Sequence, residues 1–144
     1  MSLETVRDAM VPEPTTLAAG ASAQEAGRCF ADNGEVRAIF VTDDDGRLLG
    51  VVTRKTLVRE VVAAGLEPHA VTLREIAEPP NFTLAAGLEL DGAFRFLEEQ
   101  DLERVPVVEE DGRLVGVLSR AVVQRRLAED EPPEGEPETG SLVL

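Results

Sequence analysis

The sequence is poor in several residue types that carry protein chemistry: it has no tryptophan or tyrosine, one cysteine and one histidine. A single cysteine excludes a disulfide within the chain, and Cys29 with His69 cannot provide the ligand set of a His/Cys zinc site. Histidine, the usual proton carrier of most enzyme classes, occurs only once, at His69. We therefore expect a protein that is not an enzyme and that has no metal site.

Basic residues are also few. The sequence has 14 Lys and Arg against 28 Asp and Glu, a net charge of -14 that opposes binding to nucleic acid or to an anionic membrane. No apolar run approaches the roughly 20 residues that span a bilayer, and residues 1–20 lack the basic-then-apolar layout of a secretion signal. We expect a cytoplasmic protein with neither a nucleic-acid partner nor a membrane partner.

What the sequence does contain is an internal repeat. The pentapeptide Thr-Leu-Ala-Ala-Gly occurs at residues 16–20 and again at 83–87, and Asp-Gly-Arg-Leu occurs at 45–48 and at 111–114. The repeat predicts one copy in residues 1–66 and a second in 67–129, followed by an acidic tail, 130–144, whose Pro and Gly content predicts disorder. A copy of about 60 residues is marginal as an independent domain, so the two copies should pack on each other.

Each copy has the same pattern of secondary-structure signals. In the first, Ser22 and Glu25 form a capping box that predicts a helix, Asp45-Gly46 predicts the turn of a hairpin, and Thr53 is a suitable N-cap for a second helix. The second copy repeats this order. The sequence therefore predicts an α+β (α/β-like) fold in which each copy runs strand, helix, strand, strand, helix. A pseudo-two-fold axis between the copies would leave equivalent clefts between them.

Three segments match a known family pattern: Gly-Val-Val-Thr at 50–53, Gly-Val-Leu-Ser at 116–119 and the opening segment 6–12. Through them the chain resembles tandem CBS domains, which are named after cystathionine β-synthase and are also called a Bateman module. The resemblance implies a regulatory module, usually a homodimer, that binds an adenosine-containing ligand such as AMP, ADP, ATP or S-adenosylmethionine in the clefts. No cofactor is required, and an unidentified effector protein would receive the signal. The alternative is a ligand-free dimeric interaction scaffold with degenerate clefts.

The residues that the resemblance places at the clefts fall into matching sets. Thr53 and Ser119 precede helices, whose free N–H groups favour an anion. Arg54 and Arg120 lie in the first helical turn, where a cation is disfavoured unless an anion lies between, although both could simply be solvated. The full ligand-binding set is Thr16, Arg37, Ala38, Thr53, Arg54 and Thr56 in the first copy, and Thr83, Arg104, Val105, Pro106, Ser119 and Arg120 in the second.

Other members of this set have competing interpretations. Arg37 and Arg104 either face the ligand or pair with one of the many acids, and Thr16 and Thr83 either line the cleft or are ordinary strand residues. The family pattern also places an Asp, which holds the ribose hydroxyls, where this chain has Thr56 and Val122. A lost hydrogen bond of this kind costs on the order of 1–3 kcal/mol. Thr56 can still form one hydrogen bond and Val122 none, so the sequence favours the first cleft.

Overall fold

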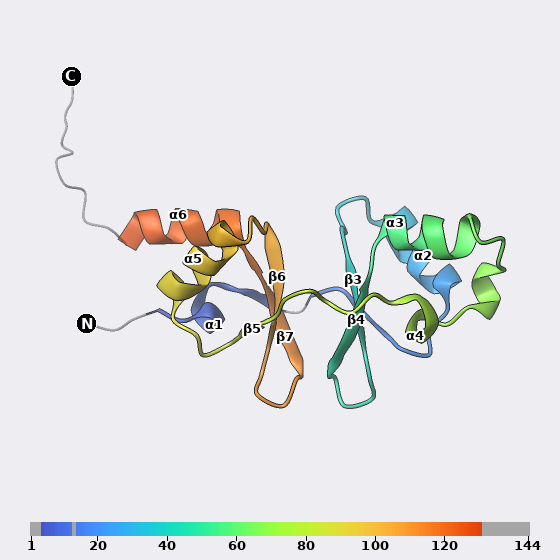
Figure 1. The fold of residues 1–144 in the computed structure, drawn as a ribbon, viewed down its shortest axis with the longest axis horizontal. Coiled ribbons are helices and arrows are strands. Elements are labelled where there is room, and N and C mark those ends of the chain that lie inside the picture. The colour runs from blue at the N-terminus through green and yellow to red at the C-terminus, as the bar shows by residue number, and fades with distance from the viewer. Residues whose placement is uncertain (1–3, 13, 131–144) are drawn as a thin grey trace, which may run out of the picture.

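The computed structural model describes residues 4–12 and 14–130. Apart from Asp130, the tail that was predicted to be disordered lies outside the described residues. Figure 1 shows two halves side by side, with the two sheets at the centre and helices covering their outer faces. In the described part of the chain, no helix is both long and apolar enough to cross a bilayer. The two halves correspond to the two sequence repeats, with one exchange between them.

The first half contains a three-stranded sheet in the order β2-β3-β4, with β2 parallel to β3 and β4 antiparallel to it. The last helix of this half begins as an α-helix and continues with π-helical hydrogen bonds. Its elements are β2 (Thr16–Ala18), α2 (Ala23–Asp32), β3 (Ile39–Thr42), β4 (Leu48–Val52), α3 (Arg54–Leu57) and η1 (Val58–Val62).

The second half repeats this order, and β5, β6 and β7 pair in the same parallel and antiparallel senses. Its elements are β5 (Leu84–Ala85), α5 (Leu90–Glu99), β6 (Arg104–Val108), β7 (Leu114–Ser119) and α6 (Arg120–Asp130). The prediction of a repeated strand, helix, strand, strand, helix unit is confirmed.

The local signals that predicted these elements act as expected. The Ser22 side chain accepts a hydrogen bond from the Glu25 amide at 3.1 Å, which caps α2. Thr53 Oγ1 accepts one from the Thr56 amide at 3.2 Å, which caps α3. Gly46 has a φ of +87°, a conformation that glycine adopts without strain, so the first hairpin turns at the predicted position.

The opening segments of the two repeats are exchanged. Helix α1 (Val6–Ala9) and strand β1 (Val11–Pro12) pack on the second half, where β1 pairs antiparallel with β7 and Val6 is fully buried. In the same way, η2 (Pro68–Ala70) and α4 (Leu73–Ile76) lead into the first half, whose core includes Leu73. Each apolar core therefore contains residues of both repeats, and separating the repeats would expose both cores.

Two glycines make this exchange possible. A Cβ atom built on Gly50 of β4 would lie 2.8 Å from Ala77 Cβ and 2.9 Å from the Glu78 carbonyl oxygen. Gly116 of β7 has the same role, since a Cβ there would lie 2.8 Å from the Val11 carbonyl oxygen. The glycine of each Gly-apolar-apolar-Thr/Ser motif therefore lets the opening segment of the other repeat cross directly over the strand.

The two hairpin turns also meet. Leu48 donates its amide hydrogen to the Gly112 carbonyl and Leu114 donates to the Gly46 carbonyl, both at 3.0 Å, around a bridge between Arg47 and Arg113. These reciprocal bonds follow the pseudo-two-fold relation between the repeats. They fix one end of the interface, and the candidate site lies along the same interface.

Candidate ligand site between the repeats

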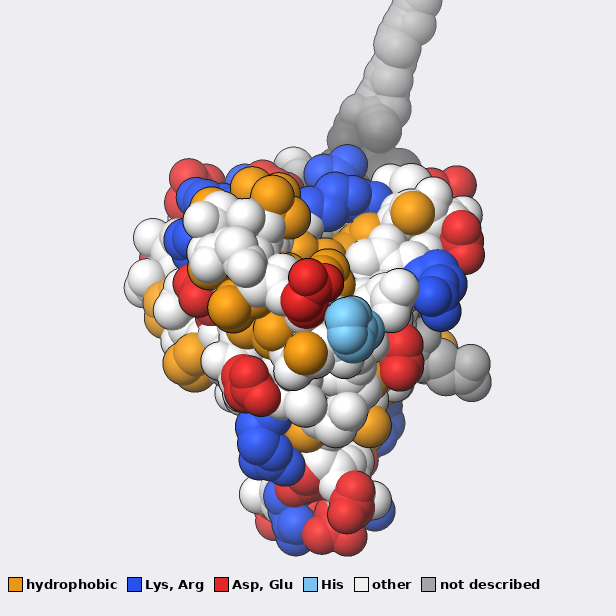
Figure 2. Space-filling view, turned by 90° about the vertical axis from the view of Figure 1, so that its right-hand side faces the viewer, with side chains coloured by type: hydrophobic (Ala, Val, Ile, Leu, Met, Phe, Trp, Pro, Cys, Tyr) orange, Lys and Arg blue, Asp and Glu red, His pale blue; other side chains and the backbone are white. Residues whose placement is uncertain are grey.

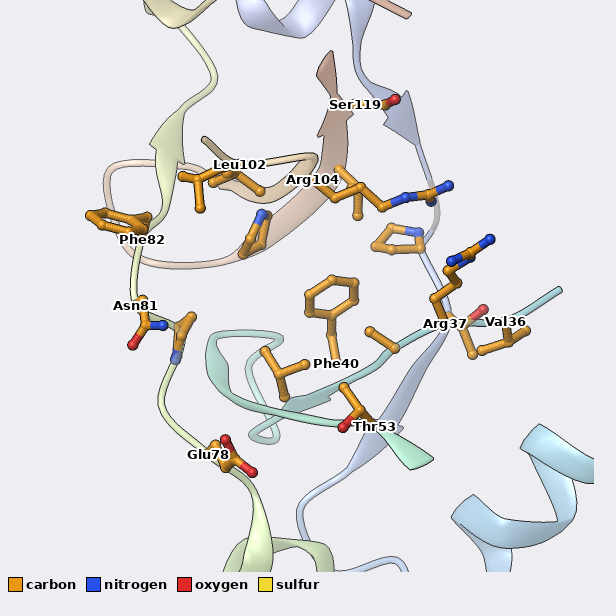
Figure 3. Close-up of a pocket in the computed structure, with 18 of the residues that line it drawn as sticks. Val36, Arg37, Phe40, Thr53, Glu78, Asn81, Phe82, Leu102, Arg104 and Ser119 are labelled. Carbon is orange, nitrogen blue, oxygen red and sulfur yellow. The ribbon is translucent and has the colours of Figure 1, made fainter. Parts of the chain in front are cut away.

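A pocket of about 560 Å³ opens between the two halves (Figure 3). This volume is within the range of small-molecule sites, which is about 300–1,000 Å³. Its wall is built largely from pairs of residues at equivalent positions of the two repeats. These pairs are Val11 and Glu78, Thr15 and Phe82, Arg37 and Arg104, Ala38 and Val105, Val51 and Val117, and Thr53 and Ser119.

The structure gathers most of the residues that the sequence placed at the clefts into this one pocket. They come from the segments just before and within β3 and β6, from the ends of β4 and β7, and, for Thr56, from α3. The predicted residues that line the pocket are Arg37, Ala38, Thr53, Thr56, Arg104, Val105, Pro106 and Ser119. The predicted residues that are not among its lining residues are Thr16, Thr83, Arg54 and Arg120.

The two strand threonines miss the pocket by one residue. Thr16 is the first residue of β2 and is exposed, whereas its neighbour Thr15 lines the pocket. Thr83 is exposed just before β5, and its neighbour Phe82 lines the pocket. Consecutive side chains of extended chain point to opposite faces, so a one-residue error in register moves the side chain to the wrong face.

Arg54 points away from the pocket for a reason the sequence did not reveal. Its guanidinium donates to the carbonyl of Val36 at 2.7 Å and to that of Phe30 at 3.2 Å. It also lies over the Phe30 ring, 4.8 Å from the ring centroid. Phe30 is in the last turn of α2, where no further helical turn satisfies the carbonyls, and Val36 lies in the loop between α2 and β3. Arg54 therefore joins the start of α3 to the end of α2 rather than facing an anion.

Arg120 is likewise engaged elsewhere. Its guanidinium pairs with Glu103 at 2.5 Å and with Asp101 at 3.4 Å. The hydrogen bond to Glu103 and the charges of both carboxylates raise the pKa of Arg120 above its ordinary value, so the side chain stays charged within this pair. The sequence left two interpretations of Arg54 and Arg120, a position beside a bound anion or simple solvation. The structure shows neither, because both side chains bind other groups of the protein.

Arg37 and Arg104 are the two predicted cations that do line the pocket. Figure 3 shows both guanidinium groups on the same side of it, one contributed by each repeat. Among the described residues, neither group forms an ion pair, although the chain carries a net charge of -14. Two like charges at one edge repel each other unless an anion lies between them. This edge is therefore suited to a negatively charged group.

The predicted contact of Thr56 with a ligand is limited by its hydrogen bonds. Thr56 is only 1% exposed, and its Oγ1 accepts from the Thr53 amide at 3.1 Å while donating to Glu78 Oε2 at 3.2 Å. Thr53 Oγ1 lies 3.0 Å from Thr56 Oγ1 and also accepts from the Thr56 amide. The hydroxyl of Thr56 is thus used within the protein, and the group that it presents to the pocket is Glu78.

Sequence reasoning missed Glu78 as a pocket residue. Glu78 lies five residues ahead of the second Thr-Leu-Ala-Ala-Gly, and Val11 lies five residues ahead of the first. The repeat alignment therefore showed a carboxylate opposite a valine in two otherwise similar segments. That difference was the available signal, but only the exchange of opening segments places Glu78 beside α3.

The apolar part of the wall suits a flat ring. Phe40 is 8% exposed and lies between the two halves of the pocket, and Phe82 packs edge-on against Phe96 with ring centroids 5.3 Å apart. Val105 and Pro106 add buried apolar surface from β6. The pocket thus combines apolar walls with one cationic edge and one carboxylate.

Comparison with known proteins agrees with the repeat and the fold. The family model of the CBS domain matches the chain twice, at residues 6–63 and 73–129. The chain belongs to the CBS domain family. This CBS domain pair is 32% identical over 133 residues to hypoxic response protein 1 of Mycobacterium tuberculosis, a match that covers 88% of this chain and 87% of that protein.

Two solved structures of CBS domain pairs carry different bound groups. Hypoxic Response Protein I with two coordinated zinc ions is 29% identical, with a TM-score of 0.72 over 86% of this chain and 99% of that one. CBSX2 in complex with AMP is 25% identical, with a TM-score of 0.68 over 87% and 96% of the two chains. Inosine-5'-monophosphate dehydrogenase of Mycobacterium leprae is also similar, at 28% identity, but the match covers only 22% of that enzyme.

The residues of this CBS domain pair do not fit zinc. Within residues 4–12 and 14–130, no group of three or more His, Cys, Asp and Glu side chains is placed to hold a metal ion. Cys29 lies in α2 and His69 in η2, so the two softest donors come from separate elements. Structural zinc takes four such ligands, and we derive no role for zinc in this chain.

Proposed function

We propose that this CBS domain pair is a regulatory module that binds an adenosine-containing ligand, AMP, ADP, ATP or S-adenosylmethionine, in the pocket between the repeats. The observation that carries the proposal is the pair of guanidinium groups, Arg37 and Arg104, beside apolar walls in a pocket of about 560 Å³. An adenine ring would pack against Phe40 and Val105, and an anionic group would lie at the cationic edge. The similar CBSX2 structure with AMP supports this choice of ligand class.

The position of the cationic edge suggests how binding would be transmitted. Because Arg37 belongs to the first repeat and Arg104 to the second, one anion between them would tie the two halves together. Without the ligand, repulsion between the two charges favours a slightly wider separation of the halves. The bound and free states would then differ in the relative position of the repeats, and an effector protein could recognise that difference.

A thermal-shift panel tests the proposal. Millimolar AMP, ADP, ATP and S-adenosylmethionine should each be compared with buffer, because a ligand that binds only the folded state raises its melting temperature. The protein has no Trp or Tyr, so adenine carried through purification would dominate its absorbance near 260 nm. A panel without any increase in melting temperature would refute the adenosine ligand.

Matched variants locate the ligand. Replacing Arg37 and Arg104 with Ala should remove most of the AMP-induced shift, because both partners of the anion are lost. Arg95→Ala is the control, since Arg95 is exposed on α5 and does not line the pocket. An AMP-induced shift that survives the double substitution unchanged would move the ligand away from this edge.

The second candidate function is a ligand-free dimeric scaffold, and an exposed apolar surface favours a homodimer in either case. Val58, Val62 and Leu66 are 58%, 70% and 49% exposed near the end of the first repeat. Val62 also lines an apolar groove between α2 and η1, and Figure 2 shows hydrophobic side chains gathered at this end of the molecule. A second copy would cover this surface. Sedimentation of the wild-type protein with and without AMP separates a dimer that binds nucleotide from an empty scaffold.

A further inference from the structure

Glu78 is a carboxylate on the pocket wall with one oxygen available. Both side-chain partners of Glu78 contact Oε2: the Thr56 hydroxyl donates to it at 3.2 Å, and the Arg59 guanidinium forms an ion pair with it. No hydrogen bond within the described residues reaches Oε1. Glu78 lines the pocket, and its side chain is 50% exposed.

The position of this carboxylate is fixed by its backbone and by its two partners. The Glu78 amide donates to the Val51 carbonyl at 3.0 Å, and the Val51 amide donates back to the Glu78 carbonyl at 2.8 Å. Arg59 is itself held by Glu60 at 3.0 Å, and hydrogen bonds to both acids raise the pKa of its guanidinium. A carboxylate held in this way is oriented before any ligand arrives, which reduces the entropy lost on binding.

We propose that Glu78 binds the sugar of the ligand by accepting hydrogen bonds from ribose hydroxyls in the first half of the pocket. This inference rests on the proposed binding of an adenosine-containing ligand. A carboxylate can only accept hydrogen bonds, so it selects a ligand with hydroxyl donors, and the two lone-pair sites of the free Oε1 can accept from the two neighbouring hydroxyls of ribose. An ionised acceptor also makes stronger hydrogen bonds than a neutral one.

The rest of the pocket agrees with this placement. In Figure 3, Glu78 lies on the opposite side of the pocket from Arg37 and Arg104, and Thr53 lies between them. A nucleotide can therefore direct its ribose to the carboxylate and its phosphate to the two guanidinium groups without bringing the phosphate close to Glu78. The ribose and the phosphate would then lie beside protein groups of opposite charge, at opposite sides of the pocket. This arrangement fixes the direction in which the nucleotide lies.

Within the described residues, this arrangement of a carboxylate on the pocket wall is found in one of the two repeats. The residue equivalent to Glu78 in the other repeat is Val11, which also lines the pocket and cannot accept a hydrogen bond through its side chain. Besides Glu78, the described lining of the pocket includes one other carboxylate, Glu35, in the loop before β3. We therefore expect one ribose-specific site per chain, and Glu99→Gln, at an exposed position of α5 that does not line the pocket, provides the control.

Isothermal titration calorimetry with AMP, 2'-deoxy-AMP and 3'-deoxy-AMP tests the inference. The wild-type chain should bind one AMP, and removal of a ribose hydroxyl should weaken binding about 10- to 100-fold, as expected for a hydrogen bond to a charged group. Glu78→Gln should weaken AMP binding by a similar factor and should bind the deoxy analogues about as well as AMP. Glu99→Gln should behave as the wild type does.

The outcomes separate the two proposals. If the wild-type chain binds AMP but Glu78→Gln keeps both its affinity and its preference for AMP over the deoxy analogues, the role of Glu78 is overturned while the proposed function stands. If the wild-type chain binds none of the adenosine ligands, both are overturned. The comparison of AMP with its deoxy analogues on the wild-type chain needs no substitution, and equal binding of the three by the wild type also contradicts the inference.

Discussion

Replacing Gly50 with Ala tests whether the opening segment of the second repeat crosses β4 as the structure shows. The new Cβ would lie 2.8 Å from Ala77 Cβ and 2.9 Å from the Glu78 carbonyl oxygen, whereas ordinary contacts begin at 3.4 Å. The crossing segment cannot easily move, because two backbone hydrogen bonds, at 2.8 Å and 3.0 Å, join Glu78 to Val51. Overpacking of this kind costs about 1–3 kcal/mol, and a contact with hydrogen-bonded backbone belongs at the upper end. We expect the free energy of unfolding to fall by about 3 kcal/mol, which is about 6–12 °C in melting temperature.

The assay is urea unfolding followed by far-ultraviolet circular dichroism, because the chain has no Trp or Tyr for fluorescence. Gly92→Ala in α5 is the control, since nothing lies within 4 Å of its added Cβ. Replacing a helical glycine with alanine should raise stability by about 0.5–1 kcal/mol. If Gly50→Ala is as stable as the wild type, the crossing segment does not rest on β4, and the placement of Glu78 in the pocket is wrong with it.

Three further predictions concern other parts of the chain. Arg54→Ala should lose about 1–2 kcal/mol of stability, because it removes the contacts with Phe30 and Val36, and it should leave the AMP-induced thermal shift unchanged; a lost shift would return Arg54 to the site. Hydrogen bonds from the Arg47 and Asp45 amides lower the pKa of Asp43, so the stability that its ionised form contributes is present above about pH 4 and is lost as pH falls through the lowered folded-state pKa. The difference in urea midpoint between wild type and Asp43→Asn should therefore shrink between pH 5 and about pH 3, and a constant difference would contradict this assignment. Val62→Asp should shift a homodimer to monomer in sedimentation experiments, and an unchanged dimer would place the interface elsewhere.

The sequence predicts the parts of this fold that depend on neighbouring residues. The N-caps at Ser22 and Thr53 and the turn at Gly46 are encoded within a few residues of where they act, and all three are confirmed. The repeat then carries each local prediction from one half to the other. For the same reason, Arg37 and Arg104 could be predicted as a matched pair before the pocket that they share was known.

The remaining features depend on contacts between distant segments. Arg54 turns toward the carbonyls of Phe30, in the last turn of α2, and of Val36, in the loop that follows, and no pattern near Arg54 reveals these contacts. Thr16 and Thr83 differ from the true lining residues by one strand position, and sequence patterns rarely fix register that closely. Glu78 reaches the first half only because the opening segments are exchanged, and this exchange depends on packing across the whole chain.

A crystal structure of the wild-type chain with AMP tests the central claim most directly. The account predicts one nucleotide per chain in the pocket between the repeats, with its phosphate between the guanidinium groups of Arg37 and Arg104 and its ribose hydroxyls on Glu78 Oε1. An empty pocket at saturating AMP, or a nucleotide bound on another surface, would contradict the account.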